Sequence, residues 1–197
     1  MRKRFSSWIC LLVLCLVQVN PANAADPAII SRAAWKASAA SFAGVPQVPK
    51  RIMIHHTGTK AHPERSTVSK MRNLQHFSQS KAKLADGRMK PAWSDVPYHF
   101  YIAANGEIAE GRAIDVAGDT NTAYNASGYI QIVVEGNFET EEPTDRQIAS
   151  LKALAKSMMR KYGIGTKDIF YHRGVAQTAC PGEKLIARLP ALIAGLQ

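Results

Sequence analysis

The spacing of apolar side chains predicts two amphipathic helices in the middle of the chain. Between residues 64 and 80, apolar positions recur at intervals of three, which places them on one helix face. A second helix is predicted over residues 144–162, because Thr144 and Gln147 can form a capping box and Gly163 can end the helix. The apolar positions are Val68, Met71, Leu74 and Phe77 in the first helix, and Ile148, Leu151, Leu154, Ala155 and Met158 in the second.

Strand signals flank the first helix and precede the second. Residues 51–55 read as a short strand, and the β-branched run 129–134 as a buried one. The segments 98–102 and 107–110 should pair as an antiparallel hairpin, because Asn105-Gly106 between them suits a tight turn.

The remaining segments complete the expected fold class. Residues 25–50 are rich in Ala and Pro and predict an extended lead-in, and residues 81–93 predict a polar loop. A last helix is predicted over residues 184–196, with Pro190 interrupting it. The sum is a single mixed α/β domain whose small mixed sheet is covered by helices.

The first 24 residues have the pattern of a cleaved signal peptide. A basic start at Arg2–Arg4 precedes an apolar run over residues 8–19, which is shorter than the ~20 apolar residues that a membrane span needs. The small residues of Ala22-Asn23-Ala24 then suit a signal peptidase. We therefore expect residues 1–24 to be removed, a single domain over residues 25–197, no membrane span, and a periplasmic or secreted protein.

The charge of the mature chain points to anionic partners. Loss of Arg2–Arg4 lowers the formal net charge from +10 to +7. Such a surface favours a cell envelope, phosphate-bearing polymers or nucleic acid. The positive charges are scattered along the sequence and form no block, so solubility alone explains them equally well.

Cys180 is the residue with the most specific chemistry. It is the only cysteine outside the signal peptide, so it cannot form a disulfide within the mature chain. It follows His172 by eight residues, and either His55 or His56 could join them, since neighbouring strand side chains point to opposite faces. Two histidines and one thiolate leave zinc a fourth position for water or substrate, as in catalytic sites. On the residues alone, hydrogen-bonded histidines and an inert buried thiol remain the alternative.

Six segments occur in the order and spacing of a known family. The chain resembles the zinc-dependent type 2 N-acetylmuramoyl-L-alanine amidases, which include the peptidoglycan recognition proteins, and the resemblance covers roughly residues 31–190. The segments are Ser31–Ala37, Ile54–Thr57, Trp93–Phe100, Asn105–Arg112, Tyr129–Phe138 and His172–Gly182.

The resemblance implies a fold and a set of roles. It implies the type 2 amidase fold, Zn²⁺ as cofactor, and the ligands His55, His172 and Cys180. The family's catalytic tyrosine falls on Tyr98, and its polar residue two positions before the ligand cysteine falls on Thr178. Together with zinc, these two residues would stabilise the carbonyl oxygen during cleavage of the amide between N-acetylmuramic acid and L-alanine.

The chain departs from the family at two positions. Gly174 replaces an aspartate that braces the ligand loop in many members, so a looser loop is expected. Val133 stands where some amidases place a catalytic glutamate. We interpret the nearby Glu135 as structural or solvent-facing, and His56 as a packed histidine rather than a ligand.

The leading hypothesis is an exported, monomeric zinc amidase of bacterial origin that acts on peptidoglycan, with no nucleic-acid partner. Bacterial origin is favoured because animal recognition proteins usually carry disulfides. One alternative is a non-catalytic peptidoglycan-binding recognition protein, although such binders typically lack the cysteine ligand. The other is an envelope or nucleic-acid binder that acts through its basic surface.

Overall fold

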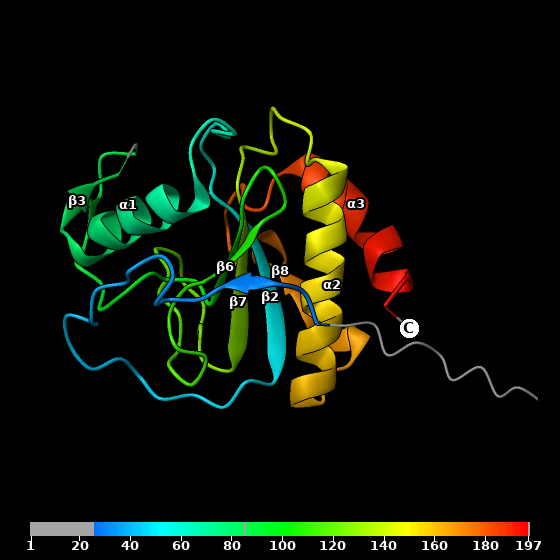
Figure 1. Cartoon of the computed structure of the whole chain (residues 1–197), viewed down its shortest axis with the longest axis horizontal. Helices are drawn as coiled ribbons and strands as arrows, with labels where there is room; N and C mark the ends of the chain where they lie inside the picture. The colour runs from blue at the N-terminus through cyan, green and yellow to red at the C-terminus, as the bar shows by residue number, and fades with distance from the viewer. Residues whose placement is uncertain (1–25, 85, 197) are drawn as a thin grey trace, which may run out of the picture.

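A six-stranded mixed sheet runs through the centre of the protein (Figure 1). The computed structural model describes residues 26–84 and 86–196, so the predicted signal peptide lies outside the described residues. The strand order is β1-β6-β5-β7-β2-β8, and within this sheet the pairing of β5 with β6 is antiparallel while the others are parallel. The strands are β1 (Ile29–Ile30), β2 (Arg51–His56), β5 (Phe100–Ile102), β6 (Ile108–Glu110), β7 (Tyr129–Val134) and β8 (Ile169–Tyr171).

The two longest strands form the middle of the sheet. β2 and β7 pair in parallel from Arg51 opposite Tyr129 to His56 opposite Val134. Both predicted strands are confirmed, and β2 extends one residue further than expected. Every residue of β7 is buried, as expected for a parallel strand covered on both faces.

The predicted hairpin is also confirmed. β5 and β6 pair from Phe100 opposite Glu110 to Ile102 opposite Ile108. Gly106 has φ +87°, in the left-handed region that favours glycine. A Cβ there would lie 2.9 Å from Cβ of Arg146, so the turn sits tightly against the second long helix.

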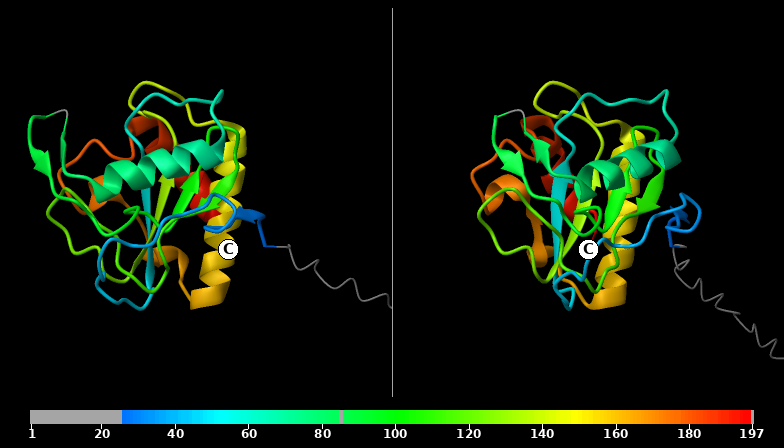
Figure 2. Two further views of the ribbon diagram at one scale, coloured as in Figure 1. Left: turned by 60° about the vertical axis from the view of Figure 1, so that its left-hand side comes forward. Right: turned by 90° about the vertical axis from the view of Figure 1, so that its left-hand side faces the viewer.

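Helices cover both faces of the sheet (Figures 1 and 2). α1 (Thr67–Gln79) lies on one face, over a core that includes Trp35, Met71 and Val133. α2 (Asp145–Tyr162) and α3 (Glu183–Ala194) lie on the other face. Their core includes Ile54 of β2 and Leu151 of α2. Two 3-10 turns, η1 (Thr166–Asp168) and η2 (His172–Gly174), flank β8.

The predicted ends of α2 are confirmed, whereas the predictions for α3 and for the buried face of α1 are wrong or partly wrong. The Thr144–Gln147 capping box and the left-handed Gly163 at the end of α2 are confirmed. The predicted interruption of the last helix is wrong, because α3 continues through Pro190. Pro190 faces solvent, where water can satisfy the carbonyl that lost its amide partner. The predicted face of α1 is partly wrong, since Phe77 is 44% exposed.

Several short strands were not predicted. β1 lies in the lead-in and β8 follows α2. The predicted loop 81–93 contains a separate two-stranded ribbon, β3 (Ala82–Lys83) paired with β4 (Met89–Lys90). Each has only two or three residues, which is too few to show a periodic pattern. In the described part of the chain, no helix has the length and apolar character to cross a membrane.

A buried ion pair ties α1 to the end of β7. Lys70 Nζ lies 2.8 Å from Glu135 Oε2, and both side chains are almost fully buried. Glu135 also accepts hydrogen bonds from the backbone N–H groups of His62 and Ala104. Burial alone would raise the pKa of the Glu135 carboxyl, but these hydrogen bonds lower it overall.

Replacing Lys70 with methionine should destabilise the fold by about 3 kcal/mol at pH 7, because Glu135 would keep a buried charge without its partner. In the natural protein this stabilisation is present above pH 4.5 and is lost as the pH falls through the lowered pKa of Glu135. Urea unfolding at pH 7 and at acidic pH measures both effects. Lys81→Met, at an exposed lysine, is the control, and an equal loss in both variants would contradict the assignment.

Candidate metal centre

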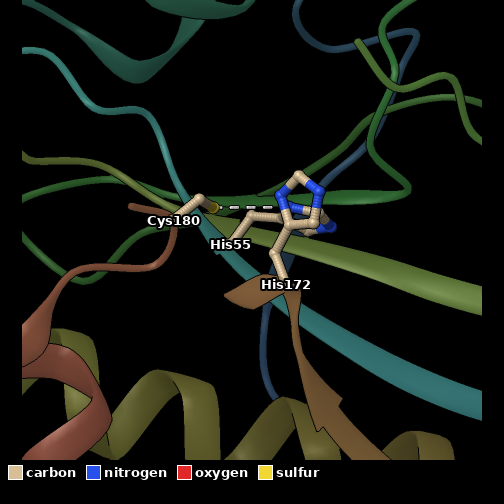
Figure 3. A group of neighbouring side chains, drawn as sticks. All are labelled: His55, His172 and Cys180. Carbon is tan, nitrogen blue, oxygen red and sulfur yellow. Dashed lines mark hydrogen bonds between the residues drawn. The ribbon is translucent and has the colours of Figure 1, made fainter. Parts of the chain in front are cut away.

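Three segments of the chain bring His55, His172 and Cys180 together (Figure 3). Their ligand atoms all lie within 4.8 Å of one another, and Cys180 Sγ is 3.5 Å from His55 Nδ1. His55 lies on β2, His172 directly follows β8, and Cys180 lies in the loop before α3. Because β8 pairs with β2, with Tyr171 opposite Ile54, the next residue of each strand reaches the same edge of the sheet.

The His55 ring is fixed by a buried glutamine. Its Nε2 lies 2.5 Å from Oε1 of Gln131, on the neighbouring strand β7. This contact assigns the proton to Nε2 and leaves Nδ1 to face the sulfur. Burial, reinforced by the nearby His172, lowers the pKa of His55 to about 3, so the ring is neutral at neutral pH, as a metal ligand must be.

The His172 ring is held in a similar way. Its Nε2 lies 2.6 Å from Oγ1 of Thr122, so Nδ1 is the nitrogen left for an ion. Burial lowers the pKa of His172 to about 4. The rings of His55 and His172 meet edge to face, with centroids 4.7 Å apart.

The loop around Cys180 presents its sulfur to the two rings. The backbone N–H of His56 donates to Sγ over 3.3 Å, which favours a thiolate. Burial raises the pKa of the thiol to about 12 despite this contact, so a cation is the natural partner that would deprotonate it. Gly182 allows the close approach, since a Cβ there would lie 2.4 Å from the Phe138 carbonyl carbon.

Arg173 braces the ligand loop where Gly174 offers no side chain. Its Nε donates to the Thr178 carbonyl over 3.2 Å, and a terminal nitrogen donates to the Ala179 carbonyl over 2.7 Å. The guanidinium also pairs with Glu139 and Glu183. Two carboxylates from outside the loop therefore hold the guanidinium that contacts the loop, in the absence of an aspartate at position 174.

The His56 ring packs on the opposite face of β2 from His55, in agreement with the expectation that only one of the two histidines faces a given site. Its Nδ1 accepts a hydrogen bond from Phe138 N over 3.2 Å, and its ring packs near the Phe138 ring. The buried His99 likewise points elsewhere, with Nε2 2.9 Å from the Val116 carbonyl. The interpretation of His56 as a packed histidine agrees with this geometry.

A cavity of about 440 Å³ opens over the three residues. Tyr98 and Thr178 both line it, and the Tyr98 ring lies 5.3 Å from the His55 ring, centroid to centroid. Burial, with the nearby Cys180, raises the pKa of Tyr98, so its hydroxyl keeps its proton at neutral pH. The other lining side chains include Leu84, Arg88, Trp93, Asp119, Asn137 and Glu139.

Sequence reasoning missed Gln131 and Thr122, the two residues that orient the histidine rings. The signal for Gln131 was available, because a lone glutamine in a β-branched run must find partners when it is buried. Thr122 lies in a polar loop whose residue pattern carries no comparable signal.

The family model described as N-acetylmuramoyl-L-alanine amidase matches residues 45–183. The chain belongs to this amidase family. It is 30% identical over 186 residues to peptidoglycan-recognition protein SD of Drosophila simulans, covering 92% of this chain and 93% of the relative. Two solved structures extend the comparison. Peptidoglycan recognition protein LE in complex with tracheal cytotoxin, a monomeric diaminopimelic acid-type peptidoglycan, aligns with TM-score 0.69 at 26% identity, covering 83% of this chain and 92% of that one. The amidase LysC from Clostridium intestinale aligns with TM-score 0.57 at 28% identity, covering 86% and 97%.

The predicted mixed α/β fold of this amidase family is therefore confirmed. Val133, where the resemblance places the catalytic glutamate of some amidases, is fully buried in the core beneath α1. Glu135 forms an ion pair with Lys70 and accepts hydrogen bonds from two backbone amides. Its contacts agree with a structural role.

Gln131→Leu should weaken zinc binding by about 10–100-fold, because the His55 ring would lose the contact that orients it. Competition with a chromophoric chelator measures the zinc affinity. Gln79→Leu, which replaces a glutamine at the end of α1, is the matched control. Equal zinc affinity in Gln131→Leu and the natural protein would show that Gln131 does not orient the ligand.

Proposed function

We propose that this protein is a zinc amidase that hydrolyses the amide between N-acetylmuramic acid and the L-alanine of the peptidoglycan stem peptide. The observation that carries the proposal is the convergence of His55, His172 and Cys180 within one cavity that Tyr98 and Thr178 also line. Membership of the amidase family supports the class of reaction.

The three donor groups suit zinc. Two neutral imidazoles and one thiolate make a three-ligand set that keeps a position open, which is typical of catalytic rather than structural zinc. His55 and His172 each use their other ring nitrogen in a hydrogen bond within the protein, as zinc-binding histidines usually do. Bound there, zinc would supply Lewis-acid activation of a water molecule and of the scissile carbonyl.

Two side chains of the cavity can stabilise negative charge on the substrate oxygen. Tyr98 keeps its proton and can donate it in a hydrogen bond. The Thr178 hydroxyl accepts from Cys180 N over 3.2 Å, which leaves its own proton for a substrate oxygen. One such donor typically contributes ~3 kcal/mol to transition-state stabilisation.

The relatives and the cavity support the proposed substrate class. Recognition protein LE, which shares the fold, binds a peptidoglycan monomer. The cavity is lined both by the aromatic side chain of Trp93 and by polar side chains such as Asn137. This combination suits a sugar linked to a peptide. A protein exported through the signal peptide expected over residues 1–24 would reach this polymer, and we propose that it acts as a monomer.

The test is release of free stem peptide from purified cell-wall sacculi by the zinc-loaded protein, followed by mass spectrometry. We expect release that stops when a chelator removes zinc and resumes when zinc is restored. No release by protein with one zinc per chain, where a known amidase works, would defeat the proposal. Binding to sacculi with substoichiometric zinc would instead favour the non-catalytic recognition protein.

A further inference from the structure

The solvent-facing side of α2 carries a row of basic residues. Lys152, Lys156 and Arg160 follow one another at intervals of four residues, so they share one side of the helix. All three are exposed, as are Ala149 and Ala153 beside them. We call Lys152, Lys156 and Arg160 the α2 basic row. The opposite side of the helix is buried through Gln147, Leu151, Leu154, Ala155, Ser157 and Met158.

Within the described residues, ion pairs compensate little of the charge of the α2 basic row. Arg160 pairs with Asp26 over 2.5 Å. The only acidic residue of α2, Asp145, pairs instead with Arg188 of α3 over 3.0 Å. Among residues 26–84 and 86–196, no ion pair engages Lys152 or Lys156. Like charges four residues apart destabilise a helix, and an anion bound along the row would remove that repulsion.

The row lies on the far side of the sheet from the cavity. α2 packs on the face that includes Ile52 and Ile54, whereas His55 points to the opposite face. Figure 2 shows α2, in yellow, standing on the side of the sheet away from α1. A ligand on the row would therefore leave the cavity free, and both could be occupied together.

We propose that the α2 basic row binds a linear phosphate polymer. Successive cations lie ~6 Å apart along the axis, so the row extends for ~12 Å and can contact several phosphates of one extended chain. The methyl groups of Ala149 and Ala153 let such a chain lie close to the helix. An anionic bilayer fits less well, because the apolar side of α2 is buried in the core and cannot insert into lipid. Charges that look scattered in the sequence are thus gathered by the helical period into one surface.

The test is the binding of fluorescent inorganic polyphosphate to the full-length mature protein, measured by anisotropy over a range of salt concentrations. The variant Lys152→Gln/Lys156→Gln/Arg160→Gln should bind more than about tenfold more weakly at low salt. The slope of log K against log salt should fall by about 2, since each lost contact removes ~0.7. The control, Lys50→Gln/Lys60→Gln/Lys81→Gln, removes the same charge from exposed positions outside α2 and should bind like the natural protein.

Three results would overturn this inference. The first is an equal loss of binding in both triple variants, which would show that only net charge matters. The second is no polyphosphate binding by the natural protein. The third is binding that depends on the α2 basic row but occurs only with phosphatidylglycerol vesicles. Cleavage of a small soluble muropeptide should be the same in all three proteins, because no substituted residue lines the cavity. That readout keeps a failure of this inference separate from a failure of the proposed hydrolysis.

Discussion

Serine in place of Cys180 should reduce amide hydrolysis by about a thousandfold or more. The hydroxyl is a much poorer zinc ligand than a thiolate, so the site would lose the several kcal/mol of charge stabilisation that a bound metal supplies, at about 1.4 kcal/mol per tenfold in rate. Release of peptide from sacculi and zinc content per chain measure the two losses together.

The fold should survive this change, because Cys180 forms no disulfide within residues 26–84 and 86–196 and serine is slightly smaller. We expect the free energy of unfolding of the zinc-free protein to change by less than about 1 kcal/mol. His76→Gln, at an exposed histidine of α1, should keep both zinc and activity. Full activity in Cys180→Ser would show that the metal centre takes no part in the reaction.

Phenylalanine in place of Tyr98 should lower kcat by about 100–1,000-fold, because in the proposed reaction the Tyr98 hydroxyl would donate a hydrogen bond to the developing oxyanion. The ring would remain beside His55, so zinc content and KM should stay close to those of the natural protein. Steady-state kinetics on a soluble muropeptide separates kcat from KM.

Tyr162→Phe, at a partly buried tyrosine at the end of α2, is the matched control and should leave kcat unchanged. If the two tyrosine variants have the same kcat with zinc bound, then the Tyr98 hydroxyl takes no part in the reaction. A loss of zinc in Tyr98→Phe would instead assign this residue to the support of the metal centre.

The strands at residues 51–55 and 129–134 and their alternation could be predicted from the sequence, and alternation indicates that only one of His55 and His56 faces a given site. The choice of His55 came from the family resemblance. The partnership of His55 with His172 could not be predicted from the strand pattern. It depends on β8, whose three residues pair with β2 and are too short to give a periodic signal. The ligand set was available at the sequence level only through resemblance to a family.

The wrong prediction for the buried face of α1 has a cause in tertiary contacts. Its buried positions include Gln75 and Ser78, which a hydrophobic pattern does not select. Gln75 is buried because its amide donates to Asp95 and to the Ser38 carbonyl. Phe77 is left towards solvent, where the Lys90 ammonium lies 5.3 Å from its ring centroid. Polar partners distant in sequence thus decided the orientation of the helix.

Chain connectivity divides the three donor groups unequally. Both imidazoles are anchored at the carboxyl ends of neighbouring strands, whereas the sulfur is carried by a loop that the contacts of Arg173 hold in place. The position of the sulfur therefore depends on this arginine, and opening of the loop and opening of β2 would be separate events. Amide hydrogen exchange in β2 and in the Cys180 loop would report these two opening events separately.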